Sequence, residues 1–107
     1  MVTIDYLIDP AQAEAFKRVM QESRRSRLRH GALEWQLFLD SADARRYTEY
    51  FVDESWVSHL RRFNRFTAAD VALRERRMQF HVGAEPPVVL RRVAEPLHGR
   101  RESGTSV

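Results

Sequence analysis

The sequence predicts an α+β domain in which helices cover one face of an antiparallel sheet, in the split β-α-β-β-α-β order. Two observations carry this prediction. Apolar and polar residues alternate over 2–8, 33–40 and 46–54, as they do in half-buried strands. Residues 10–30 and 55–78 instead place apolar side chains at helical spacing, behind good N-cap residues. At 107 residues, the chain has the size of a single domain.

The first predicted strand leads directly into the first predicted helix. The apolar face of the strand is formed by Val2, Ile4, Tyr6 and Ile8. Asp9 is a good N-cap, Pro10 suits the first helical position, and Gln12 stands where a capping box would place it. We expect this helix to run to about His30, because Gly31 is placed to terminate it.

The second and third predicted strands form a hairpin. The second strand, 33–40, has one apolar face, which consists of Leu33, Trp35, Leu37 and Leu39. Residues 41–45 supply the turn, and 46–54 form the third strand.

Two helical segments are expected after this hairpin. Asp53 or Ser55 caps the first of them, whose apolar positions are Trp56, Leu60 and Phe63. Thr67, with Asp70 three residues later, is a new N-cap for a helix whose apolar positions are Val71, Leu73 and Met78.

The C-terminal part is expected to hold one short strand and a tail. Two prolines at 86–87 precede the apolar residues of 88–93, which predicts a strand at or near a sheet edge. The composition then turns polar. We therefore predict a domain over 1–94 and a disordered tail over 95–107.

Composition argues against several kinds of site. The chain has no cysteine, which removes disulfides and thiolate chemistry. Its four glycines are isolated, so no phosphate-binding loop is present. The four histidines, His30, His59, His81 and His98, do not occur at helical i, i+3 or i, i+4 spacing. No metal site and no cofactor are therefore expected.

Charge and hydropathy limit the partners. The net charge is +3, and Lys17 is the only lysine among 18 basic residues. Arginines cluster at 24–30 and 74–77, where predicted helices end and cations are favoured, and a further cluster lies at 61–65. Nucleic-acid binding is therefore disfavoured. No apolar run is long enough to span a membrane and no signal-peptide pattern occurs, so a cytoplasmic location without membrane insertion is expected.

The second face of the predicted sheet also carries apolar side chains. They are Leu7, Phe38 and Tyr50 or Val52. An exposed apolar patch of this kind is unusual in a monomer, so we expect a homodimer formed through the sheet faces.

The order of elements, together with YTEYFVDESWVSHLRR at 47–62, resembles the antibiotic biosynthesis monooxygenase-like domains of the dimeric α+β barrel (ferredoxin-like) superfamily. The shared pattern is a strand with an internal Glu49, an acidic turn, and Trp56 followed by His59. A closer resemblance is to the variant fused behind the membrane part of some major facilitator-type exporters. Four segments carry it: IDPAQAEAF, HGALEWQLF, ESWVSHLRR and FHVGAEPPVV. The resemblance covers roughly residues 2 to 93.

The resemblance implies two facing sheets in a homodimer and a cavity between sheet and helices in each subunit. In catalytic relatives, this cavity oxidises polycyclic aromatic substrates with O2 and without metal or flavin. Such relatives often carry a second histidine about five residues after the first, where this chain has Asn64. A branch that degrades haem fits less well. Two functions stay open: a cofactor-independent monooxygenase-like protein that binds a small aromatic molecule, or a non-catalytic dimerisation or ligand-sensing module.

The candidate site residues each have a structural alternative. His59 is the candidate base, because its pKa lies near working pH, but it equally suits a hydrogen bond on a helix surface. Trp56 and Asn64 complete the catalytic set, although a tryptophan at a helix start more often packs on the sheet. The candidate ligand-binding residues, which also fit core or loop roles, are Trp35, Tyr6, Tyr50, Phe63 and His81.

Overall fold

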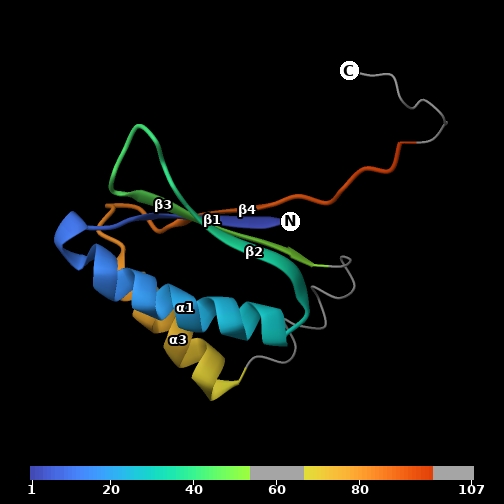
Figure 1. The fold of residues 1–107 in the computed structure, drawn as a ribbon, viewed down its shortest axis with the longest axis horizontal. Coiled ribbons are helices and arrows are strands. Elements are labelled where there is room, and N and C mark those ends of the chain that lie inside the picture. The colour runs from blue at the N-terminus through green and yellow to red at the C-terminus, as the bar shows by residue number, and fades with distance from the viewer. Residues whose placement is uncertain (54–66, 98–107) are drawn as a thin grey trace.

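A computed structural model describes residues 1–53 and 67–97. These residues form one antiparallel sheet in the order β2-β3-β1-β4, with α1 and α3 on the same face (Figure 1). The predicted α+β ferredoxin-like class is thereby confirmed. The elements are β1 (Val2–Leu7), the 3-10 turn η1 (Pro10–Gln12), α1 (Ala13–Arg29), β2 (Ala32–Leu39), β3 (Arg46–Asp53), α3 (Ala68–Phe80) and β4 (Val88–Arg91). The helix predicted around Trp56, Leu60 and Phe63 lies outside the described residues.

The two central strands, β1 and β3, supply most of the buried sheet surface. Ile4 lies opposite Glu49, and Tyr6 lies opposite Tyr47 in the antiparallel register. Burial alternates along both strands, so one face of each turns toward the helices. The period-2 pattern is therefore confirmed over 2–8 and 46–53.

The join between β1 and α1 follows the predicted chemistry with one correction. Asp9 Oδ1 accepts a hydrogen bond from the Ala11 N–H at 3.0 Å, and Pro10 opens the turn η1. Gln12 is the N-cap of α1 but makes no side-chain capping bond, so the predicted capping box is wrong. The inserted 3-10 turn moves the start of α1 to Ala13. The helix ends as predicted, with Gly31 at φ 101° just beyond it.

The apolar face predicted for β2 holds only in part. Trp35 and Leu37 pack against the core, but Leu33 is 65% exposed. The register with β3 shifts between Ala32 and Glu34, a β-bulge that buries Ala32 and turns Leu33 outward. A one-residue irregularity of this kind reverses the facing of the residues beyond it, so the assignment of Leu33 was wrong.

Helix α3 begins after the predicted N-cap Thr67, which forms a capping box with Asp70, and packs against α1. Asp70 Oδ2 accepts from the Thr67 N–H at 2.9 Å, while Thr67 Oγ1 accepts from the Asp70 N–H at 3.2 Å. Asp70 also accepts from Ser26 Oγ at 3.3 Å and lies 3.7 Å from His30 Nε2. Leu73 is buried as predicted, whereas Val71 is 45% exposed and lies off the apolar stripe.

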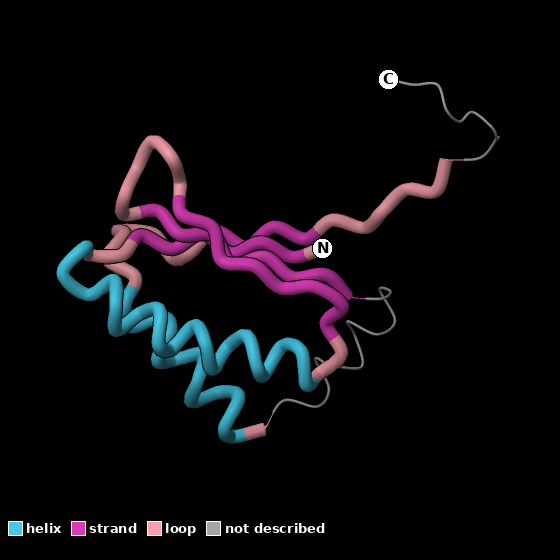
Figure 2. The backbone as a smooth tube through the Cα atoms, viewed as in Figure 1, coloured by secondary structure: helices cyan, strands magenta, loops and turns pink. Residues whose placement is uncertain are grey.

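The core lies between the two helices and the sheet, and Phe16 of α1 is at its centre. Its ring contacts Tyr6, Tyr47 and Phe80, with ring centroids 5.5, 5.4 and 5.8 Å away. The other sheet face carries no helix among the described residues (Figure 2). On that face, Phe38 is 51% exposed and, on the edge strand β4, Val88 and Leu90 are 54% and 41% exposed.

The Asp70 carboxylate makes the stability of the α1–α3 contact depend on pH. Burial would raise its pKa, but hydrogen bonds from Thr67, the charge of His30 and the Ser26 hydroxyl together lower it. A carboxyl whose pKa is lower in the folded state stabilises the fold above its unfolded pKa. This contribution is lost as the pH falls through the lower, folded value.

We therefore expect Asp70→Asn to lower the free energy of unfolding by about 1 kcal/mol at pH 7, the usual net contribution of a hydrogen bond. The difference from the unsubstituted chain should shrink as the pH drops from about 5 to 3. Urea unfolding at several pH values measures this difference in the free energy of unfolding. A difference that stays constant over this range would contradict the assignment.

Candidate ligand-binding site

A fully buried carboxylate, Glu49, lies on the helix-facing side of β3. Its Oε2 accepts hydrogen bonds from Ser23 Oγ at 2.8 Å, Trp35 Nε1 at 2.9 Å and Arg27 Nε at 3.2 Å. Its Oε1 accepts from Arg27 Nη2 at 3.3 Å. The Arg27 guanidinium also lies over the Phe51 ring, 4.4 Å from its centroid. Glu49 thus joins α1, β2 and β3 at one point.

The surroundings of Glu49 keep it ionised. Burial alone would raise its pKa, but the charge and hydrogen bonds of Arg27, the charge of Arg77 and the Trp35 indole together lower it. These donors give three hydrogen bonds to Oε2 and one to Oε1. Glu49 is therefore a structural anion that orients its neighbours, rather than a proton acceptor for a ligand.

Tyr6 and Arg77 extend this buried polar group toward α3. Arg77 Nη1 donates to Ser23 Oγ at 3.3 Å. Burial, and next the charge of Glu49, raise the pKa of Tyr6 to about 12, although Arg77 acts in the opposite direction. Burial and the charge of Arg27 lower the pKa of Arg77. At neutral pH, Tyr6 is thus a neutral phenol inside the core.

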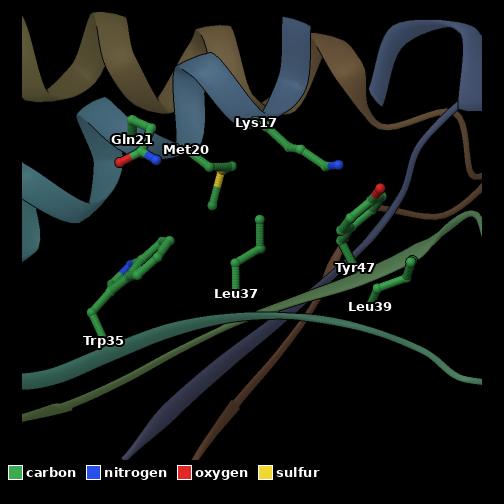
Figure 3. Close-up of a pocket in the computed structure, with 7 residues that line it drawn as sticks. All are labelled: Lys17, Met20, Gln21, Trp35, Leu37, Leu39 and Tyr47. Carbon is green, nitrogen blue, oxygen red and sulfur yellow. The ribbon is translucent and has the colours of Figure 1, made fainter. Parts of the chain in front are cut away.

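A pocket of about 320 Å³ opens beside this group, between α1 and strands β2 and β3 (Figure 3). Trp35 borders it, with its ring in the pocket wall and its indole N–H turned to Glu49. The volume lies at the lower end of the range for small-molecule sites. The lining side chains are Lys17, Met20, Gln21, Trp35, Leu37, Leu39 and Tyr47.

The structure brings only part of the predicted ligand-binding set to this pocket. Trp35 lines it, and Tyr6 lies in the adjoining core, fully buried and in contact with Phe16. Tyr50 lies on the opposite face of the sheet, where its hydroxyl donates to Glu34 Oε2 at 3.2 Å and its ring packs on Phe38. The alternation of β3 requires this, since Tyr50 falls between the buried Glu49 and Phe51.

His81 lies at the end of α3 and has a structural environment. Its Nδ1 accepts from the Leu7 N–H at 3.0 Å, so Nε2 carries the proton and donates to the Glu85 carbonyl at 2.7 Å. A Cβ on Gly83 would approach this ring to 2.6 Å, so a larger residue there would have to displace the ring from its two hydrogen bonds. The ring thus ties the end of β1 to the loop before β4, apart from the pocket.

The predicted catalytic residues Trp56, His59 and Asn64, together with Phe63, lie outside the described residues, and their assignment stays a prediction. Among the pocket residues, Lys17, Met20, Gln21, Leu37 and Leu39 were not identified as candidates from the sequence. One signal pointed to Lys17, which is the only lysine of the chain. Tyr47 was likewise not among the candidate ligand-binding residues.

Within residues 1–53 and 67–97, no three His, Cys, Asp or Glu side chains lie close enough to form a metal site. The helices described there also lack the length and apolar composition that crossing a membrane requires.

The fold defines a class of protein. It matches several solved structures whose names include "putative antibiotic biosynthesis monooxygenase". The protein from Caulobacter crescentus has a TM-score of 0.73 at 20% identity, over 89% of this chain and 88% of that one. The Nitrosomonas europaea protein has a TM-score of 0.69 at 16% identity, over 91% of this chain and 88% of that one. The Bordetella bronchiseptica protein has a TM-score of 0.66 at 22% identity, over 87% of this chain and 95% of that one. This chain therefore has the antibiotic biosynthesis monooxygenase-like fold.

The sequence gives the family. Residues 1–98 match the model of the family described as transmembrane secretion effector, and the chain belongs to this family. No curated protein matches it. Both parts of the resemblance inferred from the sequence motifs, to the monooxygenase-like domains and to the exporter-associated variant, are confirmed.

The buried ion pair predicts a large effect from a nearly isosteric change. Glu49→Gln leaves Arg27 buried without its counter-charge and turns an amide donor toward Arg27, Ser23 or Trp35. We expect the free energy of unfolding to fall by about 3 kcal/mol, measured by urea titration. The control is Glu22→Gln, which removes the exposed ion pair with Arg76 and should cost less than about 1 kcal/mol. Equal losses in the two variants would refute the structural role of Glu49.

Proposed function

We propose that this domain binds a small, flat, apolar molecule in the pocket between α1 and the β2–β3 hairpin. The observation that supports it is the pocket lining. One indole face and the side chains of Met20, Leu37 and Leu39 surround the space, with polar groups only at its ends. Such a lining favours an aromatic body, which gains from burial and from stacking on Trp35.

The test uses two-ring probes, 2-naphthamide and 2-naphthoate, titrated by calorimetry and by amide chemical-shift changes. Leu37→Trp places a larger side chain in the pocket and should weaken binding of both probes more than tenfold. Leu33→Trp adds the same side chain to the same strand at an exposed site and should leave binding unchanged. If neither probe binds the unsubstituted chain, or if both variants bind alike, the proposal is wrong.

A second candidate is catalysis, which the likeness to the monooxygenase-like fold supports. In this proposal, a methylene flanked by aromatic rings loses a proton to His59, and the resulting carbanion reacts with O2. The methylene becomes a carbonyl, and the second oxygen atom leaves as water. The substrate itself supplies the electrons.

From a substrate that carries such a methylene, we expect product in air and none without O2, with turnover lost in His59→Ala. No turnover across a broad aromatic panel, in folded protein, would count against catalysis. The subunit count of the same sample comes from native mass spectrometry.

We also propose that the outer sheet face joins two copies into a homodimer. The half-exposed side chains of Phe38, Val88 and Leu90 support it, because they leave an apolar surface uncovered on one chain. The cytoplasmic location and the domain boundary at residue 94 stay predictions from the sequence.

A further inference from the structure

The two ends of the pocket differ in chemistry. Figure 3 shows the Lys17 ammonium and the Tyr47 hydroxyl at one end, Trp35 and Gln21 at the other, and Leu37 and Met20 between them. A ligand that fills this space would therefore meet a cation and a phenol at one end only. The arrangement suits an elongated molecule with one polar end.

Lys17 is available as a cation for such a ligand. Its side chain is 49% exposed, and its Nζ contacts Glu14 Oε2 at 3.2 Å, one turn earlier on α1. The Glu14 side chain is itself 80% exposed, so this pair contributes little to stability and is readily exchanged for another carboxylate. The hydrogen bond to Glu14 raises the pKa of Lys17. Lys17 is thus an ammonium at neutral pH and does not act as an amine nucleophile.

Tyr47 supplies a fixed hydroxyl beside this cation. Its side chain is 5% exposed, and its ring is held at 53° to that of Phe16 in the core. No hydrogen bond joins the Tyr47 hydroxyl to any residue that the structure describes. The hydroxyl can therefore donate to a ligand without breaking an existing contact, and its position is set by the buried ring.

We propose that the ligand of this pocket is an aromatic carboxylate, whose carboxylate is bound by Lys17 and Tyr47 while its ring system lies against Leu37 and Trp35. This inference rests on the proposed binding function and adds the charge of the ligand to it. Two donors from different elements, α1 and β3, converge on the carboxylate. A charge-assisted bond to an ammonium is stronger than a neutral one, which gives the pocket its preference.

The experiment compares 2-naphthoate with 2-naphthamide, which has nearly the same shape and no charge. In low salt, we expect the unsubstituted chain to bind the carboxylate about tenfold more tightly. Lys17→Met should remove this preference and leave the amide affinity within about twofold. Tyr47→Phe should reduce the preference in part. The control Arg18→Met removes the same charge from the neighbouring, exposed position of α1, outside the pocket.

The outcomes separate this inference from the proposed function. Equal binding of both probes, unchanged in Lys17→Met, would overturn the carboxylate preference while leaving the pocket as a binding site. If Arg18→Met loses as much of the preference for the carboxylate as Lys17→Met does, the preference comes from the general positive charge of α1. That result would overturn the inference too. If neither probe binds, the proposed function and this inference fail together. Urea unfolding of Lys17→Met, expected to match the unsubstituted chain, ensures that a folded protein is compared.

Discussion

The buried ion pair of Glu49 and Arg27 is the constraint on which the rest of the domain depends. A carboxylate without solvent contact is tolerated only where counter-charge and hydrogen bonds surround it. Here Arg27 and Ser23 belong to α1, and the Trp35 indole belongs to β2. Ser23 Oγ also accepts a hydrogen bond from the Arg77 guanidinium of α3. Because each donor must reach the same two oxygens, the position of α1 over the sheet is fixed more narrowly than apolar packing alone would require.

The shape of the pocket follows from this constraint. The indole N–H of Trp35 is committed to Glu49, so the ring can present only its apolar surface to the space beside it. β2 is an edge strand, and α1 covers its apolar face incompletely. Leu37 stays partly exposed, and Leu39 is 52% exposed. Among the described residues, the pocket is thus the part of a core face that no helix covers, bounded on one side by a side chain that the ion pair holds in place.

Local patterns in the sequence predicted the fold well, because they act over a few residues. The alternation of β1, the Asp9 and Thr67 caps and the Gly31 stop depend on neighbours in sequence. Leu33 was misassigned because a β-bulge depends on how β2 pairs with β3, which the sequence of one strand does not specify. Tyr50 was named both for the second sheet face, where it lies, and for a cavity, although its spacing from Tyr47 is incompatible with the cavity. A glutamate between Tyr47 and Phe51 on an apolar face was the available signal for the buried ion pair.

The electrostatics of the described site separate binding from proton transfer. Burial raises the pKa of Tyr6 to about 12, so its phenol keeps its proton at neutral pH. The hydrogen bond to Glu14 raises the pKa of Lys17, which likewise keeps its proton at neutral pH. The Glu49 oxygens already accept four hydrogen bonds, and its pKa is lowered, so it accepts no proton from a ligand. Any base for the proposed oxidation must therefore come from another part of the chain, and residues 54–66 contain His59. If that histidine supplies no base, the proposed function reduces to binding alone, with Trp35 at one end of the pocket and Lys17 at the other as the groups proposed to select the ligand.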